Sequence, residues 1–321
     1  MSTPPTILEC FDQRLPLLTR SKHTYEKAKS SGQTTRDATP LKYLHPQSSE
    51  KFTDITEVLL QSDRIRLSGL RDLRISNEFE ELSLDKEAGV VCASLIYVIL
   101  PILEVLRELY PGRWVVRSEH STQVNSSLGD FSQDKKKKKQ VMSAVEKPSS
   151  NRAATMRYDL IFQTSHKHET PGKTICILEY KKREQVRYTD FQDALATDNE
   201  SLERIKRHLE VEKEHMSTMP QENGKVHIKQ LVAYAAKENC RHAALFNWNH
   251  LLVLDFTELD PAQVGSAGET AELSWVNEDG GVSCMDSDGE PGGCINNDII
   301  RKVLLGWMYH CFVEAGFDSV C

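Results

Sequence analysis

Three charged residues in apolar stretches of the sequence have the types and the spacing to act together. Glu179 and Lys181 stand two positions apart in one apolar run, and Asp159 stands in another run earlier in the chain. Side chains alternate in direction along a strand, so Glu179 and Lys181 are predicted to point to one face. If the two runs pair as a hairpin, Asp159 lies close to Glu179, and two acids and one lysine converge.

This convergence predicts a divalent cation. A carboxylate in apolar surroundings is unfavourable unless a positive group meets it. Two carboxylates held together also repel each other, and a hard cation with oxygen ligands relieves both effects. A simple salt bridge between Glu179 and Lys181 at the end of a strand is the competing interpretation.

The arrangement of these residues resembles a known nuclease motif. Asp159 followed by Glu179-Tyr180-Lys181 is similar to the core of the PD-(D/E)xK nuclease superfamily, and Glu179 begins the one E-x-K in the chain. Gln230 and Tyr234, four residues apart on one face of a predicted helix, resemble the QxxxY motif of its RecB-like branch. The resemblance covers residues 85–256. The family's proline before the aspartate is replaced by Tyr158, at a position that varies in the family.

The resemblance implies a Mg²⁺ site, with Mn²⁺ as a possible substitute for Mg²⁺. Asp159 and Glu179 would hold one or two ions, and the carbonyl of Tyr180 could add a ligand. The metal would activate a bound water and neutralise charge on the phosphate. Lys181 would orient that water or stabilise the developing charge.

The resemblance also assigns supporting residues. Gln230 and Tyr234 would position the substrate backbone or brace the metal ligands. Many family members add a glutamate from the first helix to the metal site. Glu87 is the candidate for that glutamate, and Glu119, after the first predicted strand, is the competitor.

The elements that must position these residues follow from hydrophobic periodicity. A buried helix is predicted over 84–110, capped by Ser83 or Asp85 and kinked at Pro101. Helical cover is predicted over 51–80. The other predicted elements are strands at 114–116, 156–163, 174–181, 242–246 and 251–256, and helices at 190–215, 226–237 and 297–314.

This order predicts an α/β fold with a mixed central sheet flanked by helices. The resemblance implies that its core is restriction-endonuclease-like. One domain is expected over 51–321, preceded by a mobile arm over 1–50. Long polar insertions are expected at 120–152 and 257–295, the second of them as a loop or a weak hairpin.

Composition limits the partners and the location. The net charge of −7 argues against a generic basic coat for nucleic acid, so binding would need a local patch and metal ions. The run Lys135–Lys139 fits a nuclear import signal, an arm for phosphates or a solvated loop. Eight cysteines without a CxxC pair, no signal peptide and no apolar run of about 18 residues predict an intracellular protein, nuclear or cytoplasmic, outside the membrane.

Two function hypotheses follow. The first is a Mg²⁺-dependent nuclease that hydrolyses nucleic-acid phosphodiester bonds, with DNA favoured over RNA. The second is an inactive nuclease-like scaffold that binds nucleic acid or a protein partner. A homodimer is an open alternative for either hypothesis. The scaffold hypothesis predicts a plugged site, or a Lys181 that is paired off.

Overall fold

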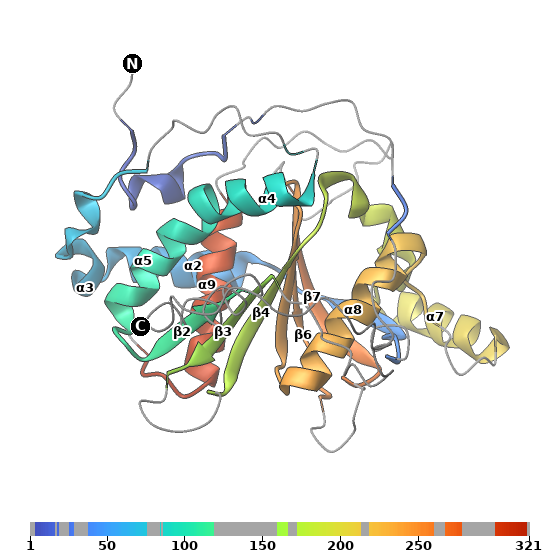
Figure 1. Cartoon of the computed structure of the whole chain (residues 1–321). Helices are drawn as coiled ribbons and strands as arrows, with labels where there is room; N and C mark the ends of the chain where they lie inside the picture. Colours follow the sequence, from blue (N-terminus) through green and yellow to red (C-terminus); the bar gives the residue numbers. More distant parts are fainter. Residues whose placement is uncertain are drawn as a thin grey trace, which may run out of the picture.

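A seven-stranded mixed sheet forms the centre of the molecule, seen in a computed structural model (Figure 1). The strand order is β1-β7-β6-β5-β4-β3-β2. The pairs β4–β5 and β1–β7 are parallel, and the other neighbours are antiparallel. The strands are β1 (Tyr43–Pro46), β2 (Trp114–Arg117), β3 (Leu160–Thr164), β4 (Thr174–Tyr180), β5 (His242–Phe246), β6 (His250–Asp255) and β7 (Thr270–Asn277). The predicted α/β class and the mixed sheet are confirmed.

The described residues are 4–16, 18, 26–28, 38–75, 84, 86–118, 159–165, 172–212, 218–259, 267–277 and 299–319. The predicted polar insertion at 120–152, with its lysine run, lies outside these ranges.

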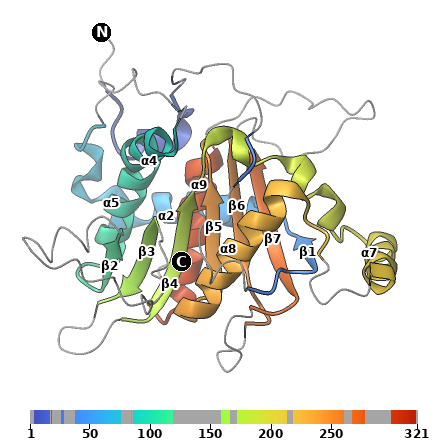
Figure 2. The same cartoon turned by 45° about the vertical axis from the view of Figure 1, so that its right-hand side comes forward.

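Helices cover both faces of the sheet, and a hydrophobic core lies on each side (Figures 1 and 2). One core contains side chains of α2, α4, α5 and α9, and the other contains those of α7 and α8. The helices are α2 (Glu50–Gln61), α3 (Asp63–Arg66), α4 (Glu87–Ser94), α5 (Leu100–Leu109), α7 (Asn199–Glu212), α8 (Glu222–Glu238) and α9 (Ile299–Glu314). They confirm helices in each predicted range, with shifted ends. The helix predicted from 190 begins at Asn199, and the 3-10 turns Tyr188–Asp190 and Gln192–Ala194 precede it.

β4 is the central strand that its sequence predicts. All seven of its residues are buried. Because side chains alternate along a strand, Leu178 and Tyr180 enter the core beneath α9, and Ile177 enters the core beneath α8. The predicted hairpin with β3 is also confirmed, with Leu160 paired to Leu178. The hairpin therefore holds the end of β4 rigidly between two packed layers.

The long buried helix is interrupted by one π-helical turn, Leu95–Ile99, between α4 and α5. The ribbon changes direction there (Figure 1). Pro101 follows the turn and has no N–H to donate to the carbonyl of Tyr97. Arg301 donates to that carbonyl instead, with its Nε atom at 2.5 Å. The break predicted at Pro101 is thus a π turn just before the proline.

The start of this helix differs from the prediction. α4 begins at Glu87 with Lys86 in the N-cap position, and the predicted caps Ser83 and Asp85 lie outside the described residues. The whole helix, Glu87–Leu109, is also long and apolar enough to cross a membrane by length and composition, which the sequence analysis did not anticipate. More than half of its apolar window, 56%, is buried inside the protein. Such burial is typical of the core helix of a soluble protein.

The described residues of the segment 1–50, predicted as a mobile arm, contact distant parts of the chain. Ile7 and Phe11 are buried in the core, and Arg301 donates hydrogen bonds to the carbonyls of Cys10 and Gln13. β1 lies at the edge of the sheet, parallel to β7. These segments are short and polar in composition, so their order depends on contacts with distant parts of the chain.

The segment 257–295, predicted as a loop or a weak hairpin, contains one strand of the central sheet. β7 lies inside the sheet, between β1 and β6. Its sequence alternates, and Ala271, Leu273 and Trp275 point into one core. The acidic, glycine-rich residues on both sides masked this period of two. Residues 260–266 and 278–298 lie outside the described part of the chain.

Candidate active site

The residues predicted to act together meet at the C-terminal end of β4. Asp159 directly precedes β3, and the register Leu160–Leu178 brings it beside Glu179. The backbone N–H of Tyr180 donates to Asp159 Oδ2 at 2.6 Å. The backbone N–H of Lys181 donates to the carbonyl of Phe246 at 3.0 Å, which ties the strand end to β5. Both neighbouring strands therefore fix the backbone of the E-x-K segment.

Glu179 and Lys181 form a buried ion pair. Lys181 Nζ lies 2.5 Å from Glu179 Oε1, and the two side chains are only 8% and 6% exposed. Oε1 also accepts a hydrogen bond from Gln230 Nε2 at 2.6 Å. The other oxygen, Oε2, is buried without a hydrogen-bond partner among the described residues. One oxygen of Glu179 is therefore saturated and the other is open to a ligand.

α8 contributes the predicted Gln230 and Tyr234 from one face. The residues are buried, and Gln230 Nε2 donates to the hydroxyl of Tyr234. This face packs against β4 and β5 and extends the polar cluster from Glu179 into the helix. The structure thus brings Asp159, Glu179 and Lys181 together with both helix residues.

Glu87 belongs to the same electrostatic cluster. It lies in the first turn of α4, where the positive end of the helix dipole favours an acid. Burial raises the pKa of its carboxyl, the nearby Lys181 ammonium lowers that pKa, and Asp159 raises it. The competitor Glu119 lies outside the described residues.

The protonation of the central pair reflects this burial. Burial raises the pKa of Glu179 to about 8, against the attraction of Lys181 and with further increases from Asp159 and Glu87. Burial alone would lower the pKa of Lys181, but the surrounding carboxylates raise it overall. Lys181 therefore stays charged, and the site has an excess of acids that a cation would stabilise.

Two residues of the same helix face were missed by sequence reasoning. His227 Nε2 lies 3.0 Å from the carbonyl of Gln185, and Asn223 Nδ2 donates to the same carbonyl at 3.0 Å. Asn223 also holds residues 26–28, because it donates to the Glu26 carbonyl and accepts from the Ala28 N–H. The signal was the helical spacing of 223, 227, 230 and 234. The helix had been predicted over 226–237, which leaves Asn223 outside it but includes His227.

The donor set fits Mg²⁺ in type. Asp159, Glu179 and Glu87 supply the carboxylate oxygens that this ion prefers, and Glu179 Oε2 is free to bind it. Within the described ranges, no group of three or more His, Cys, Asp or Glu side chains is already arranged around a single metal position. A bound ion would thus require side-chain adjustment of the carboxylates.

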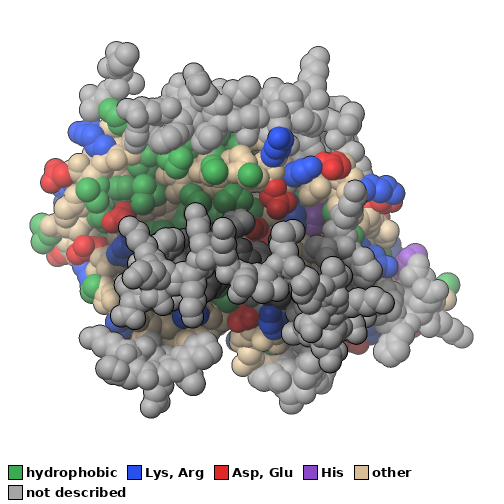
Figure 3. Space-filling view, in the orientation of Figure 1, with side chains coloured by type: hydrophobic (Ala, Val, Ile, Leu, Met, Phe, Trp, Pro, Cys, Tyr) green, Lys and Arg blue, Asp and Glu red, His purple; other side chains and the backbone are tan. Residues whose placement is uncertain are grey.

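The surface near the site carries mixed side chains. Figure 3 shows hydrophobic side chains gathered over α4 and α5, with acidic and basic side chains interspersed beside them. Leu95 and Leu100 contribute to this apolar surface, being 39% and 37% exposed.

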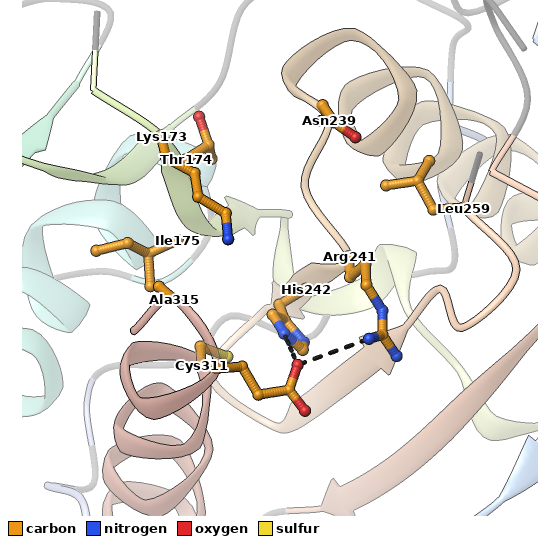
Figure 4. Close-up of a pocket in the computed structure, with 10 residues that line it drawn as sticks. Lys173, Thr174, Ile175, Asn239, Arg241, His242, Leu259, Cys311 and Ala315 are labelled. Atoms are coloured by element: carbon orange, nitrogen blue, oxygen red, sulfur yellow. Dashed lines mark hydrogen bonds and ion pairs between the residues drawn. The ribbon is translucent and has the colours of Figure 1, made fainter. Parts of the chain in front are cut away.

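A separate pocket of about 260 Å³ lies at the other ends of β4 and β5 (Figure 4). Lys173 and Arg241 line opposite sides of it. Glu314 also lines the pocket, with its carboxylate 3.0 Å from His242 Nε2 and 3.8 Å from Arg241 Nη1. The C-terminal ends of α8 and α9 add partial negative charge there. The pocket is therefore nearly balanced in charge, and β4 separates it from the acid cluster.

No protein-family model, no curated protein and no solved structure matches this chain. What the protein does must therefore be inferred from the side chains at the end of β4 and from the elements that hold them.

Proposed function

We propose that this chain is a Mg²⁺-dependent nuclease of the PD-(D/E)xK type, which hydrolyses phosphodiester bonds in nucleic acid, with DNA favoured over RNA. The observation that supports it best is the meeting of Asp159, Glu179 and Lys181 at one strand end, joined by Gln230 from α8. The order α4–α5, β2, β3, β4, α8, β5 is compatible with a restriction-endonuclease-like core. The free thiols of the described cysteines agree with an intracellular location, nuclear or cytoplasmic.

Asp159 and Glu179 would hold the metal, with the Tyr180 carbonyl and Glu87 as further ligands. The bound ion would lower the pKa of a water molecule and offset negative charge on the scissile phosphate. Glu179 is suited to this role because Gln230 and Lys181 fix one of its oxygens and leave the other open.

The chain's own groups supply orientation and charge. The buried Lys181 ammonium would stabilise negative charge that develops on the phosphate, and its effect is strengthened by the exclusion of water. Tyr234 holds Gln230, and Gln230 holds Glu179, so α8 fixes the rotamer of the acid. The hairpin and the β5 register keep the two acids and the lysine at constant spacing.

A second function is favoured by one specific observation. Lys181 is paired with Glu179, and both side chains are buried, as the scaffold hypothesis predicts. In that case the ion pair would be structural, and the protein would bind nucleic acid or a protein partner without cutting it.

The deciding experiment is cleavage of labelled single- and double-stranded DNA and RNA with Mg²⁺, Mn²⁺ or EDTA. We expect Glu179→Gln and Lys181→Met each to lower the cleavage rate about 10²–10³-fold, because each removes a group that stabilises the transition state. Glu203→Gln and Lys206→Met remove an exposed ion pair of the same residue types on α7 and serve as controls.

Metal-dependent cutting that only the site variants lose would establish the nuclease. Folded wild-type protein that cuts none of the four substrates, yet binds one of them equally well with and without the site substitutions, would establish the scaffold.

A further inference from the structure

His227 has one nitrogen whose role the fold does not explain. The side chain is 1% exposed on α8, three residues before Gln230. Its Nε2 atom faces the carbonyl of Gln185, and a carbonyl only accepts, so Nε2 carries the proton. Nδ1 is then an acceptor, and it is buried without a hydrogen-bond partner among the described residues.

The fold uses only Nε2 of His227, and a second residue makes the same hydrogen bond. The Gln185 carbonyl receives a second hydrogen bond, from Asn223, at the same 3.0 Å distance. Gln185 therefore stays attached to α8 when either donor is lost. Burying an unpaired acceptor is unfavourable, so a histidine with a free Nδ1 points to a ligand that donates to it.

The ammonium of Lys181 has more N–H donors than acceptors to receive them among the described residues. This group has three N–H donors. Within the part of the chain that the structure describes, Glu179 Oε1 is the one acceptor that this ammonium reaches. Glu179 Oε2 is a further buried polar atom without a partner among the described residues. His227 lies three residues before Gln230 on α8, and Gln230 donates to Glu179, so the imidazole is on the helix face that meets the site. Burial, with a further contribution from Lys181, lowers the pKa of this imidazole to about 3.

A single water molecule matches this set of groups. It would accept from Lys181, donate to His227 Nδ1 and make a third hydrogen bond with Glu179 Oε2, which gives the three hydrogen bonds that buried waters typically make. The imidazole is neutral at physiological pH, so it accepts the hydrogen bond without a change of protonation.

We propose that His227 is a positioning residue of the proposed nuclease site, whose Nδ1 accepts a hydrogen bond from a water molecule also held by Lys181 and Glu179. This role rests on the proposed function, because a water held against the lysine of the E-x-K segment is in place to serve as the nucleophile. His227 acts on that water by orienting it.

Two substitutions test the two nitrogens of His227 independently. In His227→Gln the side-chain amide reaches the place of Nε2, so the contact with Gln185 is kept and the Nδ1 acceptor is lost. In His227→Asn the side-chain oxygen takes the place of Nδ1, so the acceptor is kept and the contact with Gln185 is lost.

We expect His227→Gln to lower kcat about tenfold, which corresponds to about 1.4 kcal/mol, with an unchanged KM. His227→Asn should keep kcat within about twofold of the wild-type value. Full activity of His227→Gln, or equal losses in both variants together with a lower Tm, would overturn the role of Nδ1.

A second measurement does not depend on cleavage. In protein with ¹⁵N-labelled histidine, the Nδ1 resonance of His227, assigned by its loss in His227→Gln, should show a hydrogen-bonded acceptor and should move in Lys181→Met. An Nδ1 resonance typical of a free acceptor and unchanged in Lys181→Met would overturn the proposal, whether or not the protein cuts nucleic acid. Wild-type protein that shows the expected resonance and cuts nothing would instead contradict the nuclease alone.

Discussion

Two buried cations, Arg301 and Lys181, show how differently one fold can treat a charge. Both are almost inaccessible, at 3% and 7% exposure. Arg301 is surrounded by backbone carbonyls, and its guanidinium donates to those of Tyr97, Cys10 and Gln13 at 2.5–2.8 Å. Lys181 is surrounded by carboxylates and donates to Glu179 alone among the described side chains.

The surroundings decide the direction of each pKa. Burial lowers the pKa of Arg301 to about 10, because neutral carbonyls offset only part of the lost hydration. The carboxylates near Lys181 raise its pKa in spite of burial. Arg301 joins the N-terminal segment, the π turn and α9 through three hydrogen bonds to backbone carbonyls. Near Lys181 two buried polar atoms, Glu179 Oε2 and His227 Nδ1, have no partner among the described residues. Such unpaired atoms require an explanation, and a ligand bound beside Lys181 would supply one.

The largest expected effect concerns Arg301. Arg301→Met should lower the free energy of unfolding by about 3–4 kcal/mol, because three buried carbonyls lose their donor. Urea unfolding followed by circular dichroism measures this change. Arg64→Met is the control, since Arg64 is exposed and donates to one carbonyl, that of Glu108. Equal, small losses in both variants would contradict the structural role of Arg301.

The ion pair of Lys181 and Glu179 should respond in the opposite direction. In the double variant Glu179→Gln and Lys181→Met, the buried ion pair is replaced by neutral side chains of similar size. We expect unfolding free energy to stay constant or to rise by about 1–4 kcal/mol, because two charges no longer lose their hydration. The same urea experiment measures it. A loss of stability as large as that of Arg301→Met would show that the pair is structural and would sharpen the case for the scaffold.

A pH dependence should mark the acid cluster. The pKa of Glu179 is raised to about 8 in the folded chain, from an ordinary value of 4.5, so the folded state binds more protons between these pH values. Stability from this group is therefore fully present below about pH 4.5 and is lost as pH rises towards 8. Thermal unfolding at a series of pH values should show this decline in the wild type and a flatter profile in Glu179→Gln. Mg²⁺ should also flatten it, because the ion favours the charged carboxylate.

The smallest expected effect concerns residues 26–28 beside the site. Asn223→Ala should lower the free energy of unfolding by about 1–2 kcal/mol and speed tryptic cleavage after Lys27, because the side chain binds both Glu26 and Ala28. Glu26→Gln removes the ion pair with Lys182, in which the Lys182 and Glu26 side chains are 36% and 56% exposed, and should change stability by less than about 1 kcal/mol. Cleavage that is equally fast in both variants would show that the ion pair, and not Asn223, holds the segment.

The sequence by itself determined the elements whose signal is local. The apolar runs 156–163 and 174–181 predicted two strands, and their pairing as a hairpin was the condition for bringing Asp159 close to Glu179. Alternation along a strand placed Glu179 and Lys181 on one face, and helical spacing did the same for Gln230 and Tyr234. The structure brings these residues together as the pattern predicts, because strand and helix periods fix side-chain direction within a segment.

Only the tertiary structure decided the features that depend on distant partners. β1 and β7 pair with each other across most of the chain, and neither has a hydrophobic run long enough to predict a strand within its polar surroundings. The acceptors of Arg301 and the free nitrogen of His227 are invisible in the sequence, because a hydrogen bond between segments far apart leaves no periodic pattern in either one. Local sequence patterns predict which residues form the site. The packing of α8 against the end of β4 decides which of its buried polar atoms find partners.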